Sequence, residues 1–184
     1  MPNPYRVFKD DNYAYFVTCT IVDWLPVFTA EPYCQIILDS LAFIREHKAT
    51  QLNAYVLMPT HLHAILWPAK GVFLSDILRD FKRFTSRKIS GKAQENGDES
   101  FLVAFSRARH GGRLSGESNY QVWQEGSHPE AIYSEEFAHQ KMDYMHQNPI
   151  RAGLVRTILD WQYSSAPAYY SGIQTYPPID LIDL

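Results

Sequence analysis

The feature that most constrains the fold is a pair of apolar, strand-like runs that adjoin one another between residues 52 and 68. The runs are "LNAYVLMP" and "HLHAILWP", and they meet at Pro59 and Thr60. Aliphatic and aromatic runs bounded by a proline-containing turn are typical of a β-hairpin. We therefore predict two antiparallel strands here, and the rest of the chain has to complete a sheet around them.

The other patterns supply further strands and helices. A strand-like run covers 13–22, and a helix is expected over 31–48, where apolar residues recur at helical spacing. An amphipathic helix is expected over 74–89, a last strand over 119–129 and a last helix over 134–147. Asn148 and Pro149 are expected to end that helix, because a residue before proline disfavours helical backbone. This order predicts an α+β protein, a mostly antiparallel sheet with helices packed on it.

Length and composition indicate one globular domain over residues 1–184, since 46% of the residues are apolar. Between 91 and 118 the apolar pattern weakens, and "GKAQENGDES" and "HGGRLSGES" predict a flexible loop. A C-terminal tail is expected from about residue 171. Cys19 and Cys34 form neither a disulfide framework nor a zinc-type cluster. No apolar run reaches the length of a membrane span and the start lacks a signal-peptide layout, so we expect a cytoplasmic protein without a membrane partner.

Two histidines, His61 and His63, interrupt the apolar pattern of the second hairpin strand. Side chains two apart on a strand point to the same face, with Cα atoms about 6.7 Å apart. Both imidazoles can therefore approach one divalent cation and leave other coordination positions open, so that the ion can polarise a phosphate oxygen. The alternative is a pair of half-buried histidines with ordinary hydrogen bonds. The spacing alone leaves both interpretations open.

A tyrosine and a glutamine on the last expected helix complement the histidine pair. Tyr144 and Gln147 are three residues apart, so they share one side of the helix, away from the expected buried stripe of Ala138, Met142 and Met145. A tyrosine is a poor general base but serves as a covalent nucleophile once its phenol is deprotonated. A glutamine offers a neutral amide oxygen as a third metal ligand. His146 or Asn148, in the same turn, are alternatives to Gln147.

Together these segments resemble a known family. "MPTHLHAILW", "LSDILRDFKRFTSRKI", "VWQEGSHPEAI", "KMDYMHQNPIRAGLV" and "DWQYSS" are similar to segments of the single-tyrosine transposases in the His-hydrophobe-His (HUH) nuclease superfamily. The resemblance is to the REP-associated branch and covers about residues 13–170. It implies a ferredoxin- or RRM-like HUH nuclease fold, with His61 and His63 as metal ligands, Tyr144 as nucleophile and Gln147 as third ligand.

The activity that the resemblance implies is transesterification of single-stranded DNA. With Mg²⁺ or Mn²⁺ as cofactor, Tyr144 would cleave DNA at hairpin-bearing sites through a 5′-phosphotyrosine intermediate and later rejoin it. Two alternatives remain open from the residues. One is a metal-dependent nuclease or phosphodiesterase that activates water and does not use Tyr144. The other is a non-enzymatic nucleic-acid-binding module. Some relatives are homodimers that share active sites and others are monomers.

The charge distribution suits local contact with DNA. The net charge is −3, but residues 75–113 hold nine lysines and arginines against five acidic residues. A solvated helix face is the alternative explanation of this cluster. Trp67, Tyr120 and Trp123 are candidates for stacking on unpaired bases, or for the core. The predicted DNA-contacting residues of the basic segment are Arg79, Lys82, Arg83, Arg87, Lys88, Arg107 and Arg109.

Overall fold

A four-stranded antiparallel sheet forms the centre of the protein in the computed structural model, which describes residues 13–111 and 119–182. The strands are β1 (Ala14–Thr20), β2 (Thr50–Met58), β3 (His61–Pro68) and β4 (Glu130–Ile132). Their order is β2-β3-β1-β4, and every pairing is antiparallel. The predicted hairpin is confirmed as β2 and β3, whose register pairs Met58 with His61 across the Pro59–Thr60 turn.

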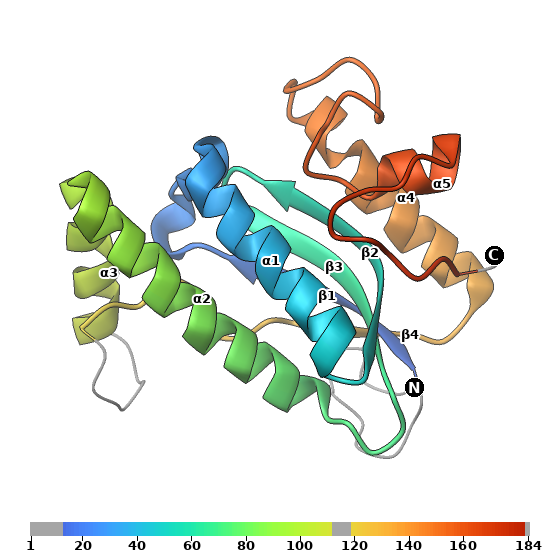
Figure 1. Cartoon of the computed structure of the whole chain (residues 1–184), viewed down its shortest axis with the longest axis horizontal. Coiled ribbons are helices and arrows are strands. Elements are labelled where there is room, and N and C mark those ends of the chain that lie inside the picture. The colour runs from blue at the N-terminus through green and yellow to red at the C-terminus, as the bar shows by residue number, and fades with distance from the viewer. Residues whose placement is uncertain (1–12, 112–118, 183–184) are drawn as a thin grey trace.

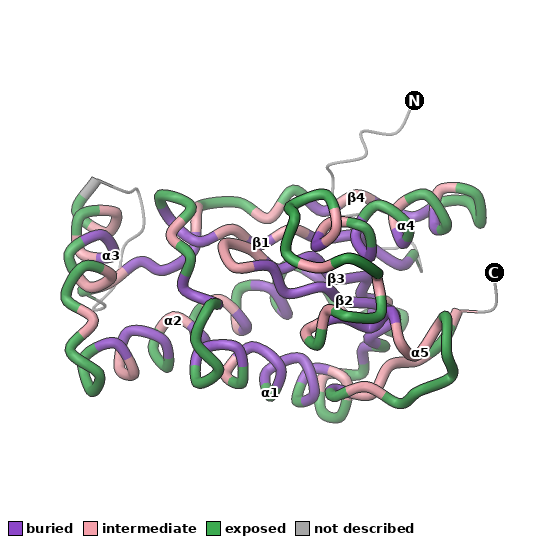
Figure 2. Tube along the Cα trace, turned by 90° about the horizontal axis from the view of Figure 1, so that it is seen from above, coloured by how far each residue is buried: buried purple, intermediate pink, exposed green. Residues whose placement is uncertain are grey.

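Helices cover both faces of this sheet, so the architecture has three layers (Figure 1). Alternation along β1 sends Tyr15 and Val17 to a core shared with α1 (Glu31–His47) and α2 (Leu74–Asn96). Phe16 faces the opposite way, into a second core shared with α4 (Glu135–Arg151). Figure 2 shows the buried strands lying between these two helical layers. The predicted α+β class, with helices packed on an antiparallel sheet, is confirmed.

Short elements complete the described chain. Two 3₁₀ turns, η1 (Val22–Trp24) and η2 (Val27–Thr29), connect β1 to α1. Helix α3 (Glu99–Gly111) follows α2, and α5 (Ala166–Ser171) lies after α4. Within the described ranges no single helix has both the length and the hydropathy of a membrane span; the η1–η2 stretch and α1, bent by 98°, meet that test only as a pair.

The predicted loop over 91–118 is wrong for most of its length. Helix α2 continues to Asn96 and α3 occupies Glu99–Gly111, whereas residues 112–118 lie outside the described part of the chain. The reason is packing. Ile89 and Ala93 continue the buried stripe of α2, and Phe105 of α3 is fully buried in the same core. Gly97, in the left-handed conformation with φ of 74°, ends α2 and allows the turn into α3.

Two further boundaries differ from prediction. The strand expected over 119–129 is only an isolated bridge between Ile21 and Trp123, and the fourth strand lies later, at β4. Helix α4 does not stop before Pro149 but runs through it to Arg151. A proline in a last helical turn removes a single backbone donor, and the buried Pro149 ring adds apolar packing in exchange.

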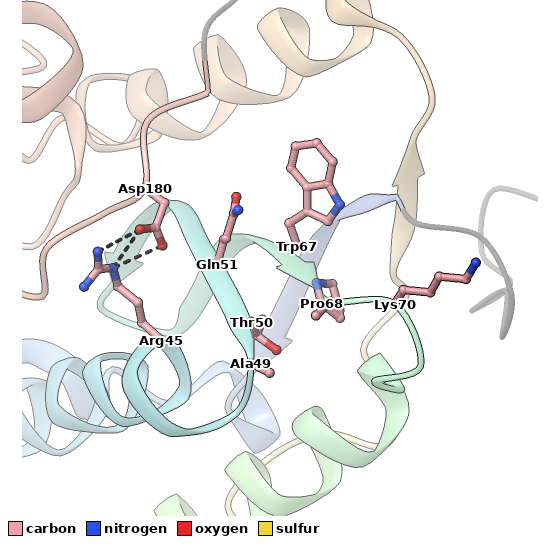
Figure 3. Close-up of a pocket in the computed structure, with 9 residues that line it drawn as sticks. Arg45, Ala49, Thr50, Gln51, Trp67, Pro68, Lys70 and Asp180 are labelled. Carbon is pink, nitrogen blue, oxygen red and sulfur yellow. Dashed lines mark hydrogen bonds and ion pairs between the residues drawn. The ribbon is translucent and has the colours of Figure 1, made fainter.

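The expected C-terminal tail lies against the edge strand β2. Asp180 accepts hydrogen bonds from the Arg45 guanidinium at 2.7 Å and from the Leu52 backbone N–H at 3.1 Å. Its own backbone N–H donates to the Leu52 carbonyl at 2.8 Å. Figure 3 shows this ion pair at one side of an open pocket, with Trp67 and Lys70 at the other. The tail thus covers part of the β2 edge that would otherwise be free to pair with another strand.

We expect Asp180→Ala to lower the free energy of unfolding by about 1–3 kcal/mol, because it strips the buried Leu52 N–H and the half-buried Arg45 of their acceptor. Asp76→Ala is the matched control, since its ion pair with Arg79 is exposed and should contribute at most about 1 kcal/mol. Urea denaturation followed by circular dichroism measures both. Equal losses in the two variants would show that the tail does not stabilise the sheet.

Candidate active site

The two histidines lie at the start of β3, on the sheet face that α4 covers. Their ring centroids are 4.7 Å apart, as expected for side chains two residues apart on one strand. The β1 partners of His61 and His63 are Thr20 and Thr18. His63 is almost fully buried and stacks on Phe16 with ring centroids 5.2 Å apart, whereas His61 is half-buried. The predicted convergence of the two imidazoles is therefore present.

Each imidazole is oriented by a threonine hydroxyl. Thr18 Oγ1 lies 2.9 Å from His63 Nδ1, and Thr60 Oγ1 lies 2.9 Å from His61 Nδ1. A hydroxyl that accepts the Nδ1–H proton leaves Nε2 with a free lone pair, which is the form that binds a cation. Both rings thus have the outer hydrogen bond that metal-binding histidines require.

The environment also favours neutral imidazoles. Burial lowers the pKa of His61, and it lowers the pKa of His63 to about 3 with help from the positive charges of His61 and Lys141. At neutral pH neither ring carries a proton that a cation would have to displace. The donor set therefore fits a divalent metal ion.

Tyr144 projects from α4 towards this pair. Its ring makes an edge contact with His63 at a centroid distance of 5.6 Å and with Phe16 at 6.2 Å, and 42% of the residue remains exposed. Ser134, which caps α4 by accepting the Phe137 N–H, fixes where the helix starts. Three residues predicted for the site, His61, His63 and Tyr144, are thus adjacent within one chain.

Two basic residues lie on the side of α4 that carries Tyr144, and neither was among the predicted site residues. The Arg151 guanidinium lies 5.7 Å from the Tyr144 ring centroid and donates to Gln147 Oε1 at 3.2 Å. Lys141 Nζ lies 4.8 Å from the Phe16 ring centroid and pairs with Glu130 at 2.8 Å. Arg151 lies seven residues after Tyr144, and Lys141 lies three residues before it. Residues at these spacings share one side of a helix, so the sequence did contain a signal for both.

The turn after Tyr144 holds the three candidates for a third ligand. His146 is buried on the other side of α4, where its Nε2 bonds Ser165 Oγ at 2.9 Å. Gln147 is exposed and its amide oxygen accepts from Arg151. At 3.6 residues per turn, Asn148 lies roughly 40° from Tyr144 towards Lys141, whereas Gln147 lies roughly 60° away in the opposite sense. The half-buried Asn148 thus projects towards the sheet better than Gln147.

No group of three His, Cys, Asp or Glu side chains in residues 13–111 and 119–182 is arranged to hold a metal ion. A cation on the histidine pair would therefore take its remaining ligands from an amide oxygen, water or a substrate phosphate. Imidazole, amide and water ligands add no negative charge, so the ion keeps its full charge for an anionic substrate.

The predicted DNA-contacting residues fall on the opposite side of the sheet, on α2 and α3. Arg83, Arg87 and Lys88 are exposed. Arg79 pairs with Asp76 and Asp80, and Arg107 pairs with Asp23. The Lys82 ammonium is half-buried and donates to the carbonyls of Gln124 and Gly126, and Arg109 is half-buried. The exposed cations of α2 are thus separated from the histidine pair by the sheet itself.

Comparison with known proteins found one informative likeness. No protein-family model and no curated protein matches the sequence. The solved structure of a REP-associated tyrosine transposase bound to a REP hairpin matches with a TM-score of 0.65 and 19% identity, over 99% of this chain and 94% of that chain. The chain has the fold of this transposase. A candidate transposase from Deinococcus radiodurans R1 matches with a TM-score of 0.49 and 17% identity, over 80% of this chain and 96% of that one.

On this transposase fold, the buried histidines make stability depend on pH. Burial lowers the pKa of His146 to about 4, below the usual value of about 6.5, so the unfolded chain takes up a proton between these pH values that the folded chain does not. The free energy of unfolding should therefore fall as the pH drops from about 6.5 towards 4, by up to about 1.4 kcal/mol per pH unit for each such histidine.

We expect His146→Gln to flatten this dependence, because a glutamine retains a donor for Ser165 but does not titrate. Urea midpoints measured at several pH values between neutral and mildly acidic provide the slope. His139→Gln, at an exposed position on the same helix, should leave the slope as in the unaltered protein. An unchanged slope in His146→Gln would contradict the assigned burial.

Proposed function

We propose that this chain is a REP-associated type of tyrosine transposase that cleaves and rejoins single-stranded DNA through a 5′-phosphotyrosine intermediate. The observation that carries the proposal is the edge contact between Tyr144 and His63, which joins a half-exposed phenol to a pair of neutral imidazoles. The fold shared with a hairpin-bound transposase supports the same conclusion.

In the proposed site, His61 and His63 hold Mg²⁺ or Mn²⁺ through Nε2, and an amide oxygen of the Tyr144–Asn148 turn is the third protein ligand. When bound, the ion polarises a non-bridging oxygen of the scissile phosphate. Gln147 is the ligand that the family pattern indicates. We propose Asn148 in its place, since it projects towards the sheet whereas Gln147 is exposed and bonded to Arg151.

Tyr144 carries out the covalent step. Its phenol loses a proton to solvent, the phenolate oxygen bonds to phosphorus, and the bond to the 3′ oxygen breaks, which leaves a free 3′-hydroxyl once that oxygen takes up a proton. The Arg151 guanidinium beside the ring stabilises the phenolate, and Lys141 adds positive charge on the sheet side. Attack by a 3′-hydroxyl on the phosphotyrosine bond reverses these steps and reseals the strand without ATP.

The proposed substrate is single-stranded DNA that carries a hairpin. The exposed cations Arg83, Arg87 and Lys88 on α2 suit the backbone of a duplex stem, on the side of the sheet away from the chemistry. Because Tyr144 contacts His63 of its own chain, we place the proposed nucleophile and histidine pair within a single chain. An RRM-like binding module presents an open sheet face for stacking, whereas both faces here are covered by helices.

Loss of the nucleophile tests the proposed chemistry. With labelled single-stranded hairpins and Mn²⁺, the unaltered protein should form a covalent adduct visible on a denaturing gel. Tyr144→Phe should reduce adduct and cleavage by at least about a thousandfold, because only the phenol oxygen is removed. Tyr133→Phe, an exposed tyrosine near the start of the same helix, is the control and should be fully active. Cleavage by Tyr144→Phe without an adduct would instead establish a nuclease that uses water.

The third ligand is tested by metal affinity rather than activity. We expect Asn148→Ala to weaken Mn²⁺ binding by about 10- to 100-fold and Gln147→Ala to change it little, as measured by electron paramagnetic resonance of free Mn²⁺. The pair is matched, since both lose an amide from adjacent positions of α4. The reverse result would restore Gln147 as the ligand. No Mn²⁺ binding by the unaltered protein would exclude the metal site.

A further inference from the structure

An exposed tryptophan adjoins the histidine pair. Trp24 lies in η1, directly after β1, and 58% of the residue is accessible to solvent. Its indole makes an edge contact with the His61 ring, with centroids 5.8 Å apart and planes at 75°. Four rings therefore contact one another in succession, from Trp24 through His61 and His63 to Tyr144. Its exposed indole thus offers a flat apolar face directly beside the candidate site.

The segment that carries Trp24 is fixed to the turn that carries His61. The Ile21 N–H donates to the Thr60 carbonyl at 2.9 Å, and the Phe28 N–H donates to the Pro59 carbonyl at 3.0 Å. Thr60 also orients the His61 ring through its hydroxyl. Both ends of the segment are thus bonded to the β2–β3 turn, so the indole keeps its place relative to the imidazole.

The backbone that presents the indole is strained. Asp23 and Trp24 have φ values of 54° and 53°, in the left-handed region that residues other than glycine seldom adopt. The ion pair between Asp23 and Arg107 of α3 helps to hold this conformation. Two consecutive residues in this region turn the chain so that an apolar ring faces solvent beside the candidate site.

Two of the three aromatics predicted as stacking candidates, Trp123 and Trp67, are less suited to that role. Trp123 is buried, and its indole N–H donates to Thr85 Oγ1 at 2.8 Å. Trp67 lies at the far end of β3, four residues from His63, which corresponds to about 13 Å along a strand. Trp24 combines exposure with direct contact to the histidine pair, and its position was not among the sequence predictions.

We propose that Trp24 is a stacking platform for the unpaired nucleobase that adjoins the scissile phosphate. This inference rests on the proposed function, because it places the bond to be broken at the histidine pair. The face of an indole accepts any base, so the platform positions the strand without reading its sequence. With Tyr144 beside His63 and Trp24 beside His61, the strand is held on both sides of the reacting phosphate.

The test is direct binding in the absence of metal. Short single-stranded oligonucleotides with 2-aminopurine at successive positions are titrated with Tyr144→Phe protein in EDTA, so that no cleavage occurs. Fluorescence at one position should be quenched, and Trp24→Ala should abolish that quenching and weaken binding by at least about fivefold. Trp24→Phe should retain part of both. Phe43→Ala, which removes a similarly exposed aromatic from α1, is the matched control.

Two comparisons separate stacking from other roles. An abasic nucleotide at the quenched position should weaken binding to Trp24-containing protein and add nothing to Trp24→Ala. Stacking is uncharged, so Trp24→Ala should leave the salt dependence of binding unchanged, whereas Arg83→Ala should flatten it. Unaltered quenching and affinity in Trp24→Ala would overturn the proposal, as would a change in oligomeric state without a change in DNA binding.

Adduct formation by protein with intact Tyr144 distinguishes this inference from the proposed function. If the adduct forms and Trp24→Ala binds DNA normally, the platform is wrong and the function stands. If no adduct forms but quenching depends on Trp24, the transesterase proposal is wrong while base stacking beside the histidines stands.

Discussion

The packing of α4 on the face of the sheet that carries the histidines is the interaction on which the candidate site depends. Ala138, Met142 and Met145 are buried against Phe16, Val56 and Ile65 of the sheet. Without this apolar contact, nothing would hold Tyr144 against His63, because the phenol and the imidazoles come from elements about 80 residues apart in sequence. Hydrophobic burial is non-directional, so the helix register, fixed by the Ser134 cap, decides which side chain faces the histidines.

Burial gives the site its electrostatic character. The same α4–sheet contact that positions Tyr144 removes water from His63 and lowers its pKa to about 3. The threonine hydroxyls then satisfy Nδ1 of both rings, so that Nε2 is the nitrogen left for a cation. Positive charge comes instead from the exposed Arg151, whereas Lys141 is mostly buried and paired with Glu130. Neutral donors beside an exposed guanidinium suit a polyanionic substrate.

The sheet also separates two kinds of surface. On one side lie the histidines, Tyr144 and the exposed indole of Trp24, and on the other the exposed cations of α2. A hairpin substrate has two corresponding parts, a charged duplex stem and an unpaired flank. Phosphate contacts position a duplex, whereas stacking holds unpaired bases, so the two faces match the two parts of the proposed substrate.

The sequence by itself determined the hairpin, the α+β class and the pairing of His61 with His63, because strand period two is a local property and fixes which side chains share a face. Helical period likewise indicated that Tyr144 lies off the buried stripe of α4. Local pattern failed at residues 91–111, where glycine and polar residues outnumber the apolar ones, although Ala93 and Phe105 of this stretch are buried in the same core as Ile89. Only the tertiary structure decided that Trp24 and Arg151 lie next to the site. It also decided that His146 points away from the site, towards Ser165. In the same turn, Asn148 projects towards the sheet better than Gln147. These outcomes depend on how α4 and the β1–α1 connection pack against β3, and contacts between segments far apart in the chain leave no periodic signal in the sequence.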